Sequence, residues 1–458
     1  MKASGVAVPK ILSERTCDEL ISSLLSWQHQ TKINDGFYTS TDTFHTYTTR
    51  SQNIIRYLYP ANIDSDPEQE LIIAGFQSQG ISDPSPKPTI VNIFDWNEYG
   101  YLTKRDDLFS NVAEQVFGGV GDVALGDFNG DGRVDIFLSG YTDPNYEVPV
   151  YALYGGQSKF SKIKVDSASW QHGAAAADFN GDGFDDVIAT GYHTSAAIYM
   201  GSSDGLIRYT WTANSYPNGS GVTANDLDNE GQIEVVISDN SKANESYHRD
   251  TNIYRLTLNE VSRSAMLSRI ASLPMPELEK PFWQPYFSTG QRKSHDIRAK
   301  SKDINSDGLN DLILFSVARN AYKGRDRNLS SVQIFINNGS LSFSDQTDNW
   351  LSGYRNRTNV TYSPVFEDLN EDGFPDLFSS EHDYDGFANS LQIFLSKNGN
   401  RLIGVPENWV SEILPASSNH EISTILVGKE EKNFIVRHVI APGFNSNEFL
   451  AYRSIAVQ

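Results

Sequence analysis

The most chemically suggestive feature of the sequence is a nine-residue acidic pattern, Asp-x-Asn-x-Asp-Gly-x-x-Asp, which recurs along the chain. Its first, third, fifth and ninth residues carry side-chain oxygens, and its sixth residue is usually glycine. These oxygens and the backbone carbonyl of the seventh residue can converge on one hard cation, because glycine allows the sharp turn between them. Three or four carboxylates in each loop suit calcium. The pattern therefore predicts calcium-binding loops.

Six copies of the pattern start at residues 62, 127, 178, 226, 303 and 368, and we number them copy one to copy six. Copy four has glutamate at its fifth and ninth positions, and copy one has Pro67 where the others have glycine. We expect five to six calcium ions in all. Counting the seventh residue for its backbone carbonyl, the expected metal ligands are Asn62, Asp64, Asp66, Glu68, Glu70, Asp127, Asn129, Asp131, Arg133, Asp135, Asp178, Asn180, Asp182, Phe184, Asp186, Asp226, Asp228, Glu230, Gln232, Glu234, Asp303, Asn305, Asp307, Leu309, Asp311, Asp368, Asn370, Asp372, Phe374 and Asp376.

Two other interpretations of one copy are a plain turn and an EF-hand. Asp, Asn and Gly are also the usual turn residues, so it is the recurrence that favours calcium. An EF-hand needs an acid at position 12 and flanking helices. Apolar, strand-like stretches such as residues 136–138 follow the ninth position instead, so each ion is expected in a β-hairpin turn. Position 12 is Leu138, Ala189, Ile237, Leu314 and Ser379 in copies two to six.

The elements that must position these loops follow from their spacing. The mean step between copies is about 61 residues, which fits a four-stranded propeller blade. A further strand pair at residues 421–428 and 434–441 has no acidic loop and would make a seventh blade. The sequence therefore predicts an all-β fold, a seven-bladed β-propeller of four-stranded blades with a short N-terminal helical segment.

The two ends of the chain are expected to have different roles. Residues 1–35 form a helical cap, in which Thr16 and Glu19 make a capping box. Residues 36–458 form the propeller. Its last blade runs out after three strands, so residues near 40 to 50 are expected to supply the fourth strand and close the ring.

The repeated unit of strand, acidic loop and apolar strand resembles the FG-GAP/VCBS repeats of integrin α-subunit heads and many bacterial surface proteins. The resemblance covers roughly residues 50–445. It implies a seven-bladed propeller with calcium in the loop between the first two strands of a blade. It also implies that ligands bind on the opposite face.

Long loops on that opposite face are the expected ligand-binding region, because such loops often carry function. Their candidate residues are Tyr141, Tyr146, Tyr322, Arg325, His382 and Tyr384. One tryptophan follows each acidic copy, and it either packs between blades or offers a stacking platform for sugar rings. These tryptophans are Trp96, Trp170, Trp211, Trp283, Trp350 and Trp409.

Composition excludes several classes of function. The chain has 58 acidic and 37 basic residues, a net charge of −21, which argues against binding nucleic acid. Cys17 is the only cysteine, so neither an internal disulfide nor a Cys-ligated metal is expected. No apolar run is long enough to span a membrane, and no signal peptide is visible.

Two functions remain open from the sequence. The first is a calcium-stabilised binding or adhesion module for a glycan or protein ligand, located outside the cell, on a cell surface or on a virus particle. The second is a polysaccharide-degrading lyase or hydrolase on a calcium-rich propeller, although no known catalytic motif is present. A central cluster of Arg, His and Tyr would favour the enzyme, whereas shallow repeated pockets between blades would favour a carbohydrate-binding protein.

Overall fold

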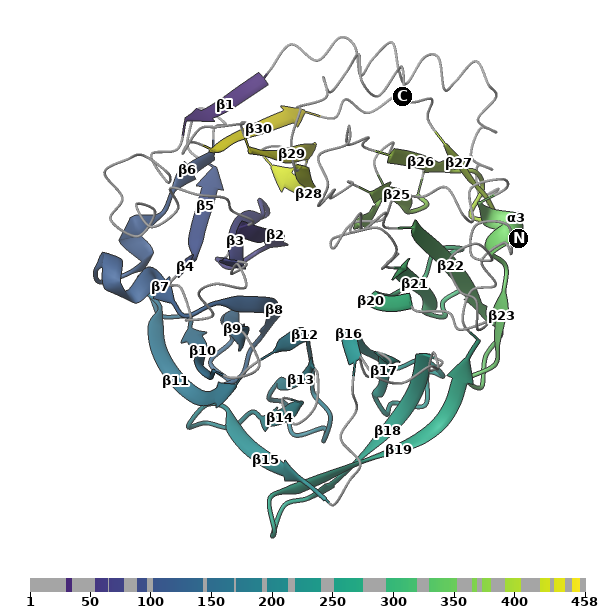
Figure 1. Ribbon diagram of the computed structural model, residues 1–458, viewed down its shortest axis with the longest axis horizontal. Coiled ribbons are helices and arrows are strands. Elements are labelled where there is room, and N and C mark those ends of the chain that lie inside the picture. Colours follow the sequence, from purple (N-terminus) through teal and green to yellow (C-terminus); the bar gives the residue numbers. More distant parts are fainter. Residues whose placement is uncertain are drawn as a thin grey trace, which may run out of the picture.

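The protein is a ring of antiparallel β-sheets (Figure 1). The part of the chain that a computed structural model describes contains mainly strands. Each sheet runs outward from the centre of the ring like the blade of a propeller, so the arrangement is propeller-like. The described residues are 30–34, 54–64, 66–77, 89–96, 102–142, 146–168, 170–191, 196–212, 219–239, 251–274, 294–318, 329–351, 365–368, 373–379, 392–404, 421–428, 432–440 and 447–453.

The first two sheets each have four strands in sequence order. The first contains β2 (Ile54–Ala61), β3 (Glu70–Gln77), β5 (Asn92–Trp96) and β6 (Leu102–Lys104). The second contains β8 (Val120–Gly126), β9 (Asp135–Gly140), β10 (Val148–Tyr154) and β11 (Ser161–Ala168). Between them lie the strand pair β4 (Thr89–Ile90) and β7 (Val116–Phe117) and the 3-10 helices η3 (Asp106–Leu108) and η4 (Val112–Gln115).

The next sheet has eight strands because two four-stranded units join edge to edge. One unit is β12 (Gln171–Ala177), β13 (Asp186–Gly191), β14 (Ala197–Met200) and β15 (Ile207–Trp211). The other is β16 (Gly219–Asn225), β17 (Glu234–Asp239), β18 (Thr251–Asn259) and β19 (Ser264–Leu273). Strands β15 and β19 pair in parallel, with Trp211 opposite Ala265, and this joins the two outer edges.

Three more four-stranded sheets complete the ring. They contain β20 (Ser294–Lys302), β21 (Asp311–Ala318), β22 (Leu329–Asn337) and β23 (Phe343–Asp345), followed by the short helix α3 (Thr347–Trp350). The next sheet contains β24 (Val365–Glu367), β25 (Asp376–Ser379), β26 (Gln392–Ser396) and β27 (Leu402–Gly404). The last contains β28 (Glu421–Gly428), β29 (Lys432–Ile440), β30 (Asn447–Arg453) and β1 (Gln30–Asn34).

The last sheet joins the two ends of the chain, but not through the segment that we expected. Strand β1 pairs antiparallel with β30, and Gln30 lies opposite Tyr452. This pairing fills the place that residues 40 to 50 were expected to take, and those residues lie outside the described part of the chain. Residues 1–29, which contain the expected helix, lie outside it too.

The hydrophobic core lies between neighbouring sheets. The second strands β9 and β13 are buried along their whole length, since a sheet covers each of their faces. For example, Ile72 of β3 and Ile136 of β9 belong to one buried cluster, and Phe137 of β9 and Tyr199 of β14 belong to the next. The core therefore consists of layers between blades that hold the acidic loops at one end of each sheet.

Three of the described tryptophans, Trp96, Trp211 and Trp350, take part in packing, and the fourth, Trp170, is half-buried. Trp96 and Trp350 are buried, and Trp350 belongs to the core between β22 and β25. Trp211 is half-buried, and its indole N–H donates to the carbonyl of Ala196 at 2.9 Å. Trp283 and Trp409 lie outside the described residues. The packing interpretation fits Trp96 and Trp350, which leave no exposed ring face for a sugar.

Within the described part of the chain, the helices are all too short or too polar to cross a membrane.

Candidate metal-binding loops

Each acidic copy connects the first strand of a sheet, or of a four-stranded unit, to its second strand. Copy one lies between β2 and β3, copy two between β8 and β9, and copy three between β12 and β13. Copies four, five and six follow in the same way after β16, β20 and β24. The ninth residue of each copy is the first residue of the second strand. The loops are therefore hairpin turns, as the apolar stretches after them indicated.

Backbone N–H groups gather the side-chain oxygens of a regular loop, as copy two illustrates. Asp127 accepts from the N–H of Asp131 at 3.0 Å and from the N–H of Gly132 at 2.8 Å. Asn129 accepts from the N–H of Asp131, and Asp131 accepts from the N–H of Arg133, both at 3.0 Å. Gly132 has a φ of +79°, which glycine adopts without strain. The oxygens of the first and third residues thus meet around the N–H of the fifth, whose own carboxylate also pairs with the guanidinium of Arg133 at 2.8 Å.

Copies three and five repeat this arrangement. Asp178 accepts from the N–H groups of Asp182 and Gly183, and Asp303 accepts from those of Asp307 and Gly308. In copy six the N–H of Gly373 donates to Asp368 at 2.7 Å. Asn370 and Asp372 of copy six lie outside the described residues. The seventh residues of copies three, five and six are Phe184, Leu309 and Phe374. The N–H of Phe184 donates to the side chain of Asp182.

The ninth acid is wholly buried in all six copies. In copy two, one oxygen of Asp135 accepts from the N–H of Phe128 at 3.0 Å and the other from the N–H of Gly155 at 2.7 Å. Asp186 and Asp311 make the same two kinds of bond. The ninth acid therefore ties its loop to the far end of the third strand.

Burial has a clear effect on these carboxyl groups. Loss of hydration raises the pKa of Asp135 and Asp186 to about 7, although the backbone N–H bonds act in the opposite direction. The same cause raises the pKa of Asp311 to about 6. A cation beside these groups would favour their ionised form.

Copy four departs from this arrangement because a guanidinium lies among its ligand positions. Arg255 of β18 is opposite Glu234 in the strand register. Its Nε donates to Glu234 at 3.0 Å, its Nη2 donates to Asp228 at 2.8 Å, and Glu230 lies 3.7 Å away. The oxygens of Asp226, Asp228 and Glu234 also lie within 4.8 Å of one another. Arg255 therefore supplies positive charge from the third strand, where the regular copies have an uncharged residue; the arginine of copy two, Arg133, belongs to the loop itself and pairs with Asp131 at 2.8 Å.

Copy one also departs from the pattern. The amide Nδ2 of Asn62 donates to the backbone carbonyl of Asp66 at 2.5 Å, so this group is a donor inside the turn. The oxygens of Asp64 and Glu70 lie within 4.8 Å of those of Asp95, a residue of β5. Burial, followed by the charges of Asp64 and Asp95, raises the pKa of Glu70 to about 8. Glu68, of which we expected only the backbone carbonyl to matter, is itself buried.

Asp95 and Arg255 were not identified from the sequence, and they are the functional candidates that the structure adds. Both stand on a third strand, next to the ninth acid of their copy, and more than 20 residues along the chain from it. Nothing in the nine-residue pattern points to them. Only the pairing register of the second and third strands would have found them.

The loops of neighbouring sheets contact one another. The N–H of Asp127 in copy two donates to the side chain of Asp185 in copy three at 2.8 Å, and the N–H of Asp185 donates to the carbonyl of Asp127 at 3.0 Å. The side chain of Asn229 in copy four donates to the carbonyl of Gly308 in copy five at 3.2 Å. These hydrogen bonds therefore couple the conformation of one loop to that of the next.

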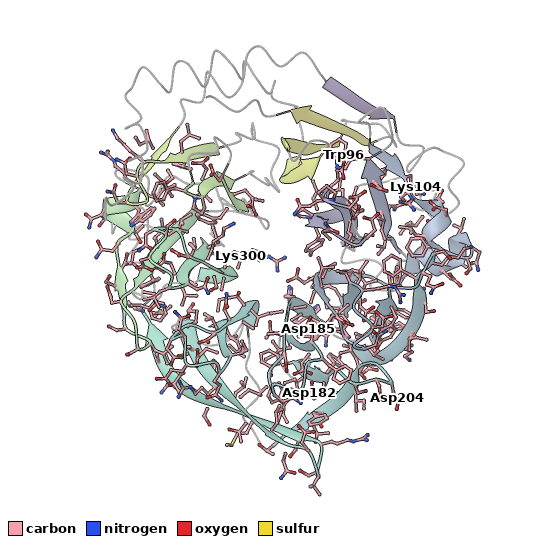
Figure 2. The ribbon with its side chains drawn as sticks, turned by 180° about the vertical axis from the view of Figure 1, so that it is seen from behind. Trp96, Lys104, Asp182, Asp185, Asp204 and Lys300 are labelled. Atoms are coloured by element: carbon pink, nitrogen blue, oxygen red, sulfur yellow. The ribbon has the colours of Figure 1, made fainter. Side chains whose placement is uncertain are left out.

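A second polar cluster lies at the centre of the ring. Arg298 of β20 donates to Asp122 of β8 at 2.7 Å, and the hydroxyl of Tyr59 donates to the other oxygen of Asp122 at 2.6 Å. Figure 2 shows Lys300 at the centre of the ring. Solvent reaches Lys300, but the surrounding protein lowers the pKa of its ammonium group by desolvation. Asp122 counters this effect, and Arg298 adds to it.

The expected ligand-binding residues are not brought together in the part of the ring that is described. The ring of Tyr141 is half-buried and meets the ring of His172 edge to face, with centroids 4.7 Å apart. Tyr146 is 38% exposed. The adjacent outer strands β11 and β15 border an open hollow of about 350 Å³, lined by Glu147, Lys164, Asp166 and Arg208 among others. Tyr322, Arg325, His382 and Tyr384 lie outside the described residues.

Comparison with known proteins agrees with the repeated pattern. No curated protein matches the chain significantly. One solved structure, a crystal structure of a protein from Lactobacillus plantarum, aligns with 85% of this chain and 97% of its own at 11% identity and a TM-score of 0.42. The FG-GAP-like repeat family matches residues 127–189, 178–237 and 303–379, which contain copies two to six. The resemblance deduced from the acidic loops is confirmed: the chain carries FG-GAP-like repeats in three places.

Proposed function

We propose that the chain is a calcium-stabilised binding module built on a seven-bladed β-propeller. The blade count follows if the eight-stranded sheet is taken as two blades joined at β15 and β19. Each blade then has four strands, and β1 completes the last one. This architecture supports binding because its loops are held on a rigid ring.

The observation that carries the calcium proposal is the repeated ninth acid. In every copy it is wholly buried, and in copies two, three and five the charges of the first and fifth acids act on it. A fold keeps such a group when a bound cation or a hydrogen-bond network compensates its charge. Oxygen-only ligands of this number suit calcium better than zinc or copper, which favour nitrogen and sulfur.

The copies should not bind equally well. Copies two, three, five and six keep the regular pattern and are expected to bind one ion each. Arg255 already neutralises much of the acidic cluster of copy four, so calcium should bind there weakly or not at all. Calcium counting in the protein after dialysis tests the proposal, and a chain that retains no ion would refute it.

The ligand is proposed to be a glycan or a protein, bound on the face opposite the acidic hairpins, at a cell surface or on a virus particle. In the hairpins, the polar side chains are already used to bond the loop backbone. The exposed Tyr146 and the neighbouring hollow lie at the other end of the strands of the same sheet, where side chains are available for a ligand. A glycan array with calcium and with chelator tests this assignment. Binding that disappears in Tyr146→Ala, with an unchanged melting temperature, would support this face.

A polysaccharide-degrading enzyme is the second candidate. The central cluster favours it because it holds Arg298 and Tyr59, and Arg298 also donates to the backbone carbonyl of His172 at 3.3 Å, so the expected residue types Arg, Tyr and His lie together. In the structure, however, Arg298 and Tyr59 both donate hydrogen bonds to Asp122. Their polar groups therefore link the inner strands of the ring and are not free to bind a substrate. We therefore place the binding module first. Incubation with anionic and neutral polysaccharides, followed by an assay for new reducing ends or unsaturated products, separates the two functions.

A further inference from the structure

The residue opposite the ninth acid on the third strand differs in kind from copy to copy. In the β3–β5 register Leu71 pairs with Phe94, so the next pair brings Glu70 opposite Asp95. Copy four has Arg255 at this place. The same step in copies two, three, five and six gives Tyr154, Met200, Ile336 and Leu395. Copy one is therefore the copy in which the third strand adds an acid.

The added acid belongs to a tight cluster. Oxygens of Asp64, Glu70 and Asp95 all lie within 4.8 Å of one another. Glu70 has no exposed surface, and Asp95 is only 8% exposed. Like charges at this separation repel each other strongly in a buried site. A cation between these groups would relieve the repulsion when all three are ionised.

Glu70 provides an independent sign of a missing partner. Its Oε2 accepts from the N–H of Ile63 at 2.6 Å. Its Oε1 is buried and has no hydrogen-bond partner in the structure. A buried carboxylate oxygen without a partner is costly, and such atoms are rare in native proteins. Because Glu70 belongs to the cluster, a cation bound there would give this oxygen a partner.

We propose that a calcium ion binds between Asp64, Glu70 and Asp95, with Asp95 as a ligand contributed by the third strand. This set differs from the five loop positions. Pro67 replaces glycine at the sixth position, and the amide of Asn62 donates to the carbonyl of Asp66. Asp66 in turn accepts from the N–H of Glu68 at 3.0 Å, and its side chain is outside the cluster. Asp95 thus compensates for the altered loop.

Charge balance agrees with a divalent ion. Arg105 of the segment after β6 forms an ion pair with Asp95 and binds Asp107 at 2.9 Å. Because Arg105 is shared with Asp107, it cannot neutralise the three carboxylates of the cluster when all are ionised, and a divalent cation would offset the remaining negative charge. All candidate donors are oxygens, which suits calcium rather than a transition metal. The choice of calcium rests on the function proposed above, but the cluster itself does not.

The test uses Asp95→Asn, which keeps the shape of the side chain and removes its charge. Calcium would be counted by elemental analysis after dialysis against buffered calcium, alongside the wild type and Asp107→Asn. Asp107→Asn is the matched control, because it removes the other partner of Arg105 without touching the cluster. We expect Asp95→Asn to bind one ion fewer than the wild type and Asp107→Asn to bind the same number.

A wild-type ion count in folded Asp95→Asn would overturn the proposal. If that variant does not fold, Asp64→Ala decides instead, because it removes a proposed ligand oxygen and Asp64 is exposed, so the substitution should be tolerated. Asp182→Ala separates this site from the regular loops. If Asp95→Asn loses an ion and Asp182→Ala does not, the proposed loop sites fail while this one stands. The reverse result refutes only this site.

Discussion

Arg298 and Asp122 form an ion pair at the centre of the ring, 2.7 Å between Nη1 and Oδ2, although 176 residues separate them in the chain. They stand on β20 and β8, the innermost strands of two sheets that are not neighbours around the ring (Figure 1). Both side chains are about one-tenth exposed. The hydroxyl of Tyr59, on β2, also donates to Asp122, so the interaction links three strands.

Removing one partner of this pair should destabilise the protein strongly. Arg298→Met leaves Asp122 buried without its counter-charge, and the expected loss in the free energy of unfolding is about 3–5 kcal/mol. Arg208→Met is the control, because the ion pair of Arg208 with Asp166 is at the surface and such pairs are worth about 1 kcal/mol or less. Urea denaturation measures both. An equal loss of unfolding free energy in the two variants would show that the central ion pair stabilises the fold no more than a surface pair does.

Chelation should lower the melting temperature substantially. Without cations the acids of the loops repel one another, and metal that binds only the folded state stabilises it by mass action. Differential scanning calorimetry in EDTA, then with added calcium or magnesium, measures the effect. We expect calcium to restore the melting temperature and magnesium to restore it poorly, since magnesium demands a tighter octahedral shell. A melting temperature that EDTA leaves unchanged would contradict the calcium proposal.

A single regular loop can be emptied selectively. Asp182→Ala removes the fifth position of copy three, so it should abolish one calcium ion and lower the melting temperature in calcium. Asp204→Ala is a control of equal charge, because Asp204 is exposed in a turn of the same four-stranded unit (Figure 2). Ion counting on both variants gives the result. Loss of an ion from Asp204→Ala, or none from Asp182→Ala, would show that the register of copy three is wrong.

Copy four should gain calcium dependence when its guanidinium is removed. In Arg255→Met, Asp228 and Glu234 lose their internal cation, so the variant should bind one more calcium ion than the wild type. Its melting temperature in EDTA should fall further than that of the wild type, and calcium should restore most of the difference. Arg208→Met again serves as the control. An unchanged ion count would mean that Arg255 does not stand in for a cation.

The metal-free protein should lose stability as the pH rises from about 4 to about 7. The pKa values of Asp135 and Asp186 are raised to about 7 in the folded protein, so the folded state binds protons more tightly than the unfolded state. Their contribution to stability is complete below their unfolded pKa, near 4, and is lost as the pH passes through about 7. Urea denaturation in EDTA at several pH values measures this slope. Asp135→Asn should flatten it, and an unaltered slope in that variant would contradict the assignment.

The sequence predicts best what is encoded locally. The hairpin loops and the strand that begins at each ninth acid, such as Asp135, follow from a pattern of a few neighbouring residues. Asp95 and Arg255 could not be predicted, since their roles depend on the register of strands that lie apart in the chain. The pairing of Arg298 with Asp122 depends on the curvature of the whole ring. The closing strand was misplaced because an edge strand such as β1 is selected by backbone pairing, with little in the polar segment 30–34 to mark it.

The pairing of β1 with β30 also determines how the ring would respond to tension. Because the two strands are antiparallel and Gln30 lies opposite Tyr452, the chain before β1 and the chain after β30 leave from the same end of the pair. A force that pulls these two segments apart loads the backbone hydrogen bonds one after another, beginning at Gln30, rather than all at once. When the chain is pulled from its two ends, β1 should therefore separate from β30 one hydrogen bond at a time, at low force. A pull between two loops of other sheets would meet greater resistance.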